Sequence, residues 1–220
     1  MATTLTAPQT APANRSARFL AWSQAHQKLL MIVGGALLAI GLVIWFLITA
    51  GARREDFANR SLNQARGIAE SGNIVLASTE FQKLIDTYPG TGASREAEIS
   101  LNQLRLISGQ QELAIVRLRE FLKGNLEPKY MAAGNALLGA ALENAQKHAE
   151  AGNAYKAASD AATLDYLKAD YLLQAARAYQ AGGKNADALA ALKTVIDKYH
   201  ETPALTEAQV RLGELTKGEM

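Results

Sequence analysis

The sequence predicts an all-α protein, in which a single N-terminal transmembrane helix is followed by an α-solenoid of about four helical hairpins and a C-terminal capping helix. Two observations support this fold class. The chain of 220 residues contains one long apolar run, from Leu29 to Ala50, without a charged residue. Beyond that run, alanine and large apolar residues recur every 37 residues, at spacings that place them on one face of a helix.

The apolar run is long enough to cross a membrane. Its 22 residues, LLMIVGGALLAIGLVIWFLITA, form a helix of about 33 Å at about 1.5 Å per residue. The hydrocarbon core of a bilayer is about 30 Å thick, and a helix satisfies its own backbone hydrogen bonds there. A cleaved signal peptide and a buried core helix are the alternatives. Because signal peptides have a shorter apolar region of about 7–15 residues, we expect an uncleaved transmembrane helix over residues 29–51.

The residues before this run are expected to form a tail and a surface helix. Residues 1–15 are rich in Ala, Thr and Pro and lack a periodic apolar face, which predicts disorder. Residues 16–28 can form a juxtamembrane helix with Trp22 at the headgroup level, where tryptophan is favoured. Three Lys or Arg residues precede the span and four follow it within 20 residues, so the charge pattern alone leaves the orientation open.

The charge distribution argues against a nucleic-acid-binding domain. Residues 1–54 hold five basic and no acidic side chains, which leaves 18 basic against 21 acidic side chains in the rest of the chain. A nucleic-acid-binding domain would carry its basic excess on its own surface, so we expect no nucleic-acid partner. The chain has no cysteine, which excludes disulfides and thiolate metal sites.

A repeat begins after the apolar run and is expected to form one domain over residues 55–217. Each repeat has an alanine, then a large residue four positions later and an apolar residue three positions after that. The three sets are Ala77, Ala114, Ala151 and Ala188; Phe81, Leu118, Tyr155 and Leu192; and Leu84, Phe121, Ala158 and Val195. A lone hairpin cannot bury its apolar face, so the copies are expected to stack, with an amphipathic helix after Pro203 as the cap.

Glycine marks the turn inside three of the four hairpins. Gly72, Gly109 and Gly183 keep the interval of the repeat, whereas Gln146 stands at the same place in the third repeat. Glycine at a fixed place between two helical segments is typical of a turn.

These residues resemble the tetratricopeptide repeat (TPR) family. The fourth repeat matches its motif closely, with Ala176, Tyr179, Gly183, Ala188 and Leu192 on the helix and turn positions. The second repeat departs from the motif, because Asn102 stands where a small residue is expected and Arg105 where an apolar one is expected. We therefore expect the first helix of that repeat to pack less closely.

One span followed by such repeats also resembles a narrower group, the YfgM-like ancillary subunits of the bacterial SecYEG translocon. The segments EFQKLIDTYPGT (80–91) and ALKTVIDKYHETP (191–203) are similar to the helix ends of that group. This resemblance implies a bacterial inner-membrane protein with a cytoplasmic N-terminus and a periplasmic repeat domain. It also implies protein partners, namely the Sec translocon, a periplasmic chaperone or translocated polypeptides.

The TPR resemblance also implies a binding face, because the first helix of each TPR hairpin lines the concave side of the solenoid. The residues at those positions are Asn59, Leu62, Arg66, Glu96, Ile99, Gln103, Ala133, Ala136, Ala140, Asp170, Leu173 and Arg177. Their mixed apolar and polar character suits an amphipathic or extended peptide; ordinary solvated positions are the alternative. The lysine–asparagine clamp of some TPR domains is not matched, because Leu62 and Arg66 stand at its first two places, which disfavours recognition of a chaperone C-terminus.

The sequence offers no constellation for catalysis or metal binding. His26, His148 and His200 lack the helical spacing of a ligand pair, and neither a glycine-rich phosphate loop nor a G-x-S-x-G motif is present. We therefore expect no enzyme activity, no cofactor and no small-molecule substrate. The expected function is that of a membrane-anchored protein-interaction module. The alternative is a structural scaffold of a membrane or cell-envelope complex that contacts partners mainly through its transmembrane helix.

Overall fold

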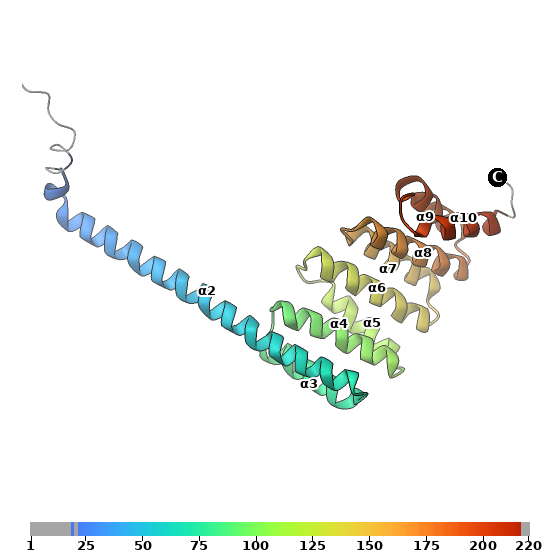
Figure 1. Cartoon of the computed structure of the whole chain (residues 1–220), viewed down its shortest axis with the longest axis horizontal. Helices are drawn as coiled ribbons and strands as arrows, with labels where there is room; N and C mark the ends of the chain where they lie inside the picture. Colours follow the sequence, from blue (N-terminus) through green and yellow to red (C-terminus); the bar gives the residue numbers. More distant parts are fainter. Residues whose placement is uncertain (1–18, 20–21, 217–220) are drawn as a thin grey trace, which may run out of the picture. The chain divides into compact units, whose positions relative to one another are not determined.

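The computed structural model describes Phe19 and residues 22–216, and all the regular structure in them is helical (Figure 1). The helices are α2 (Gln27–Glu70), α3 (Ile74–Thr87), α4 (Gly92–Ile107), α5 (Gln111–Phe121), α6 (Pro128–Asn144), α7 (His148–Ala161), α8 (Asp165–Ala181), α9 (Asn185–Lys198) and α10 (Ala204–Leu215). The all-α class is therefore confirmed. The predicted tail, residues 1–15, lies outside the described residues, as do residues 16–18 and 20–21 of the predicted juxtamembrane helix.

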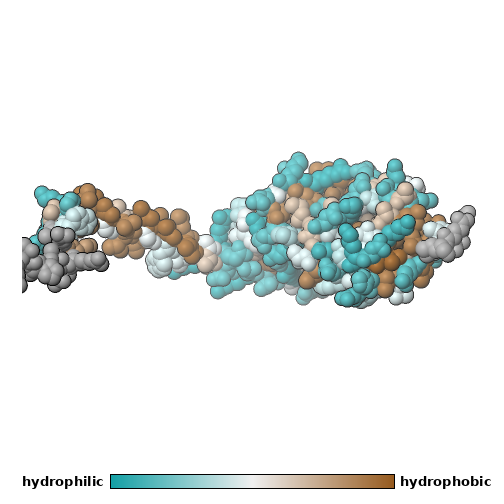
Figure 2. Space-filling model, turned by 90° about the horizontal axis from the view of Figure 1, so that it is seen from above, coloured by the Kyte–Doolittle hydropathy of each residue, from teal (hydrophilic) through white to brown (hydrophobic). Residues whose placement is uncertain are grey.

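The chain divides into two compact units, residues 1–53 and residues 54–220. In the first unit, α2 carries the apolar run, and the side chains from Leu29 to Ile48 are all exposed. Figure 2 shows this segment as a hydrophobic stretch of surface. By length and composition it could cross a membrane, a property that N-terminal signal sequences share.

The second unit is a row of helical hairpins. Its first helices are α2 from Arg54 onward, α4, α6 and α8, and its second helices are α3, α5, α7 and α9. From α3 to α10 each helix packs on the next one, and α10 also packs on α8 (Figure 1). The prediction of about four hairpins and a C-terminal capping helix is thus confirmed, because α10 covers the end of the last hairpin.

The repeated residues form the core of this row. The four alanines that define the repeat, Ala77, Ala114, Ala151 and Ala188, are completely buried. The large residues that follow them, Phe81, Leu118, Tyr155 and Leu192, are also buried. Each fully buried side chain of that size contributes about 1.5–3 kcal/mol. Phe121 is the one member of the three repeated sets that is only half-buried.

The turns inside the hairpins share one backbone conformation. Gly72, Gly109, Gln146 and Gly183 all have positive φ, at 83°, 72°, 57° and 71°. In the last three turns the N–H of the following residue donates to the carbonyl five positions back, over 2.8 Å in each case. This is the bond that closes a Schellman C-cap. Gln146 therefore makes the same turn as the glycines that it replaces.

The buried apolar residues form two clusters rather than one. The first cluster lies in α2, α3 and α4, and the second extends from α5 to α10. The break falls between the two helices of the second repeat, whose first helix carries Asn102 and Arg105 in place of a small and an apolar residue. Asn102 is buried and Arg105 half-buried, so polar side chains occupy this junction.

Candidate functional site

The residues predicted to bind a partner lie on the first helices of the hairpins, but they differ in exposure. Asn59, Arg66, Gln103, Asp170 and Arg177 are exposed, whereas Glu96, Ile99, Ala133, Ala136 and Ala140 are half-buried. These ten residues are called the first-helix face below.

Leu62 and Leu173 do not belong to this face, which corrects the prediction. They are only 2% and 3% exposed, and each is part of one of the two core clusters. A position transferred from a motif does not say on which side of the helix an apolar side chain packs. Burying a leucine side chain is favourable by about 1.5–3 kcal/mol relative to leaving it exposed. Neither residue is therefore available to a partner.

Two polar interactions order the first-helix face. Arg66 Nη2 lies 2.7 Å from Glu96 Oε2, which joins the first helices of repeats one and two. Asp170 Oδ2 accepts a hydrogen bond from Gln174 Nε2 over 2.6 Å. Arg66 and Glu96 are both partly exposed, so their attraction contributes at most about 1 kcal/mol.

Tyr155 connects this face to the core. Its hydroxyl donates to Glu143 Oε2 over 2.6 Å. Burial and then the bond to Glu143 raise the pKa of Tyr155, so the tyrosine stays a neutral donor. Asp170 and Arg177 act on the same hydroxyl through their charges.

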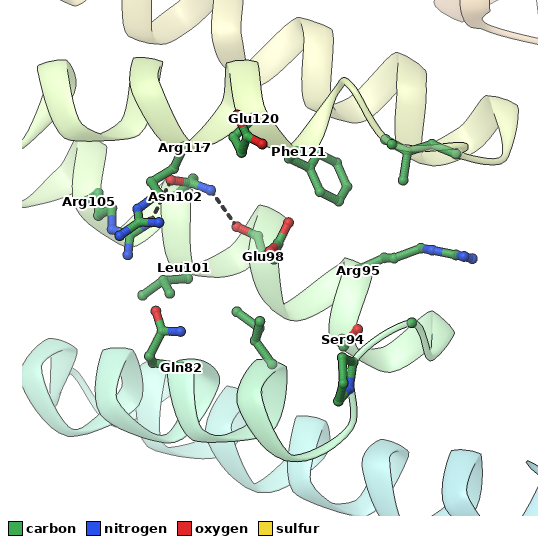
Figure 3. A pocket seen from close by; sticks show the side chains of 15 residues that line it. Gln82, Ser94, Arg95, Glu98, Leu101, Asn102, Arg105, Arg117, Glu120 and Phe121 are labelled. Atoms are coloured by element: carbon green, nitrogen blue, oxygen red, sulfur yellow. Dashed lines mark hydrogen bonds between the residues drawn. The ribbon is translucent and has the colours of Figure 1, made fainter.

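A second candidate surface, which the sequence analysis did not predict, is a cleft on the side of the second helices. It consists of two adjoining hollows of about 330 Å³ and 720 Å³, which share Gln82, Leu101 and Arg105. Helices α3 and α5 form its walls and α4 its floor. It is called the α3–α5 cleft below, and Figure 3 shows the first hollow.

The floor of this cleft carries a polar cluster beside Leu101. Asn102 is only 2% exposed, and its amide donates to the carbonyl oxygen of Glu98 over 2.9 Å. Its Oδ1 accepts from Arg105 Nη1 over 2.8 Å (Figure 3). Burial raises the pKa of Glu98, although the charges of Arg105 and Arg117 oppose this. Burial and then the neighbouring Arg117 lower the pKa of Arg105.

Two of the three arginines that line the cleft, Arg105 and Arg117, have no carboxylate within ion-pair distance: among the described residues, no acidic oxygen lies within 4.0 Å of either guanidinium. The sequence signal that points to this site is the departure of Asn102 and Arg105 from the repeat. Among the residues that the structure describes, no three His, Asp or Glu side chains lie close enough together to hold a metal ion.

Comparison with solved structures shows the fold of the chain. The crystal structure of MamA protein has 19% identity and a TM-score of 0.57, over 74% of this chain and 82% of that one. The putative kinesin light chain of Podosopora anserina, with nearly identical TPR-like repeats, has 16% identity and a TM-score of 0.58, over 73% and 85% of the two chains. No protein-family model and no curated protein matches the sequence. The chain thus has a TPR-like, all-helical repeat fold.

Proposed function

We propose that this protein is a membrane-anchored, non-enzymatic module that binds polypeptide partners on its first-helix face. The observation that carries the proposal is the open face of four consecutive first helices in a TPR-like row. Stacked helical repeats offer extended surfaces of this kind to protein partners. Half-buried Ile99 and Ala136 beside exposed Gln103 and Arg177 suit an amphipathic segment.

The apolar part of α2 supports the membrane anchor. Its leucine, isoleucine, valine and phenylalanine side chains are exposed from Leu29 to Ile48. Each such side chain gains about 1.5–3 kcal/mol when it leaves water, and a bilayer would cover all of them at once. Anchoring also raises the effective concentration of the repeats near membrane partners, so that weak contacts suffice.

The finer proposal follows from the resemblance to YfgM-like subunits. The N-terminus would lie in the cytoplasm of a bacterium and the repeats in the periplasm, where the Sec translocon, a chaperone or emerging polypeptides are the partners. Protease added to spheroplasts should then cleave the repeat domain. A domain that is protected until the inner membrane is ruptured contradicts this topology.

Site-specific photocrosslinking in intact membranes tests the binding face. A photoreactive residue at Asn59, Gln103 or Arg177 should give adducts with a partner polypeptide. The same residue at Lys193 or Asp197, both exposed on the second helix α9, is the matched control and should give none. Adducts from the α9 positions alone would refute the first-helix face as the binding surface.

The exposed apolar helix also favours a second candidate function, that of a scaffold whose main contact is the span itself. Replacing Leu29–Ala50 with an unrelated apolar helix of equal length separates the two proposals. A module that binds through its repeats keeps its partner after the exchange, whereas a scaffold of this kind loses it.

A further inference from the structure

The row of helices in the second unit has two edges. Because short connections make consecutive helices antiparallel, the connections between hairpins lie along one edge and the turns inside hairpins along the other (Figure 1). The edge with the connections is called the link edge below, and the other is called the turn edge. The connections are residues 88–91, 122–127, 162–164 and 199–203, and the turns are residues 71–73, 108–110, 145–147 and 182–184.

Neighbouring connections lie close together along the link edge. The hydroxyl of Tyr130 donates to the carbonyl oxygen of Gly92 over 3.3 Å, which joins the start of α6 to the start of α4. Asp165, at the start of α8, lines a hollow together with residues 198–202, which include most of the fourth connection. The link edge is therefore a surface that successive connections form, rather than a set of separate loops.

The chain enters the repeat row at the link edge. Arg54, the first residue of the second unit, donates from Nη2 to the carbonyl oxygen of Pro89 over 3.2 Å. The next residue, Glu55, accepts hydrogen bonds from two N–H groups at the start of α4. Arg54 follows Ala50, the last residue of the apolar run, by four positions. Four residues span at most about 14 Å, so a run that crosses a bilayer holds this edge close to the membrane surface.

The two edges differ in their distance from Arg54 and in their side chains. The first helix α4 has 16 residues, so the turn edge lies about 24 Å from the link edge at 1.5 Å per residue. The four turns contain no apolar residue larger than alanine. Each connection, in contrast, has at least one large apolar or aromatic residue, as in Tyr88, Leu126, Leu164 and Tyr199.

Leu164 and Tyr166 expose large side chains at the link edge. They are 48% and 55% exposed, on either side of Asp165 at the start of α8. Asp165 forms an ion pair with Lys168 over 3.2 Å. A leucine gains free energy when it leaves water. Tyrosine is favoured at the level of the lipid headgroups, where its ring is covered and its hydroxyl stays hydrated. Both residues thus suit a membrane interface.

The connections do not carry the charge that would attract anionic lipids. They hold one lysine, Lys123, against two acidic residues, Glu127 and Glu201. Basic clusters beside a membrane bind anionic headgroups, and this edge has no such cluster. A contact between the link edge and a bilayer would therefore depend on apolar side chains and not on the headgroup charge.

We propose that the link edge is a second, peripheral membrane contact, in which Leu164 and Tyr166 insert into the headgroup layer of the bilayer that the apolar run spans. Because the span keeps the edge beside the bilayer, insertion of two side chains suffices through effective concentration. The inference rests on the membrane anchor of the proposed function. It does not depend on what the first-helix face binds.

Fluorescence in nanodiscs tests this contact. The chain has no cysteine, so a single introduced cysteine can carry the fluorophore NBD in the full-length protein. In phosphatidylcholine nanodiscs, a label at Leu164→Cys or Tyr166→Cys should shift its emission to the blue. Lipids spin-labelled at the headgroup should quench it by about twofold or more. The matched control is Ile107→Cys, because Ile107 is 64% exposed beside a turn of the opposite edge. Its label should show neither effect.

A second measurement separates the two side chains from the label itself. Asn125, exposed in the second connection, carries the fluorophore through Asn125→Cys. Combining this variant with Leu164→Ser and Tyr166→Ser should reduce its quenching by the spin-labelled lipid. Combining it with Val75→Ser and Ile107→Ser, which change two exposed residues near the turn edge, should leave the quenching unchanged. The unfolding temperature should stay the same in both combinations, so a loss of quenching is not a loss of folding.

Several outcomes would overturn the proposal. These are equal quenching at positions 164 and 107, or a signal at Asn125→Cys that the two serine substitutions at the link edge leave unchanged. Quenching that requires phosphatidylglycerol, or that disappears at high salt, would assign the contact to charge and overturn it as well. A protein that does not enter nanodiscs would refute the membrane anchor itself. Incorporation with labels that stay in water would refute this contact alone.

Discussion

The ring of Tyr179 lies against the backbone of Gly152, so closely that a Cβ atom on this glycine would be 2.4 Å from the ring carbon Cδ1. The hydroxyl of Tyr179 also donates to Oδ1 of the adjacent Asn153 over 2.8 Å. The tyrosine is therefore held at both ends, and α7 and α8 pack closely around it. Gly139 meets the ring of Tyr155 in the same manner, at 2.7 Å.

Gly152→Ala should destabilise the protein by about 1–3 kcal/mol, because the ring of Tyr179 must shift and its hydrogen bond to Asn153 is then strained. Alanine is the better helix former by about 1 kcal/mol, so the clash must outweigh that gain. Gly67→Ala is the control, since Gly67 lies in a helix with open space around it. It should raise the unfolding temperature in far-UV circular dichroism, while Gly152→Ala lowers it. Equal shifts would contradict the packing argument.

Gln146→Gly should stabilise the protein by about 0.5–1 kcal/mol. Gln146 has a φ of 57°, and this left-handed conformation costs a residue with a side chain about 1–2 kcal/mol. Relief of this cost is partly offset, because glycine has greater conformational freedom in the unfolded chain. Gly183→Ala is the reverse change at the same place in the next repeat and should cost about 1 kcal/mol. Denaturant titration of the full-length protein measures both changes, and a less stable Gln146→Gly protein would disprove the reasoning.

Glu55→Ala should destabilise the protein by about 1–2 kcal/mol. The two carboxylate oxygens of Glu55 each accept a backbone hydrogen bond at the start of α4, from Gly92 and Ala93, over 3.1 Å. Carboxylates are favoured at helix N-termini, where N–H groups lack partners inside the helix. Asp56→Ala, at an exposed neighbouring position, should stay within about 0.5 kcal/mol of the wild type. Similar losses in both variants would contradict the capping role.

Glu98 should make stability depend on pH. Its pKa is raised above 4.5, first of all by burial, so the folded protein binds this proton more tightly than the unfolded chain does. The contribution of Glu98 to the free energy of unfolding therefore falls as pH rises above about 4.5. Glu98→Gln removes this effect. The unfolding temperature of the variant minus that of the wild type should increase between about pH 4 and pH 7, and a constant difference would exclude the role of Glu98.

The sequence allowed the repeated parts of the fold to be predicted, because four copies of one pattern strengthen each other. Ala77 and its three counterparts indicated the buried face, and the turn glycines indicated where each hairpin reverses. Gln146 shows how this evidence works, since the repeat predicts its turn even though the residue itself does not favour one. Hydrophobic periodicity also separated the apolar segment of α2 from the amphipathic helices that follow.

The candidate sites were harder to predict, because they depend on contacts between residues far apart in the chain. The bonds of Glu55 span 37 and 38 residues, and nothing in its local sequence marks it as a helix cap. Leu62 and Leu173 stand at positions that the TPR resemblance implied to face a groove, whereas they pack inward. Arg105 departs from the repeat in the sequence, but only the packing of α3, α4 and α5 brings Arg117 and Glu98 close to it.

The apolar core is divided into two blocks between α4 and α5, and these two helices pack on each other less extensively than any other consecutive pair from α3 to α10. In linear arrays, each unit is held mainly by its neighbours, so a weak junction decouples the two sides. Native-state hydrogen exchange should therefore report two cooperative openings, with amides of α3 and α4 exchanging together and earlier than those of α7 and α8. The boundary between the two blocks would lie at residues 108–110, so α3 and α4 would unfold before α7 and α8 do.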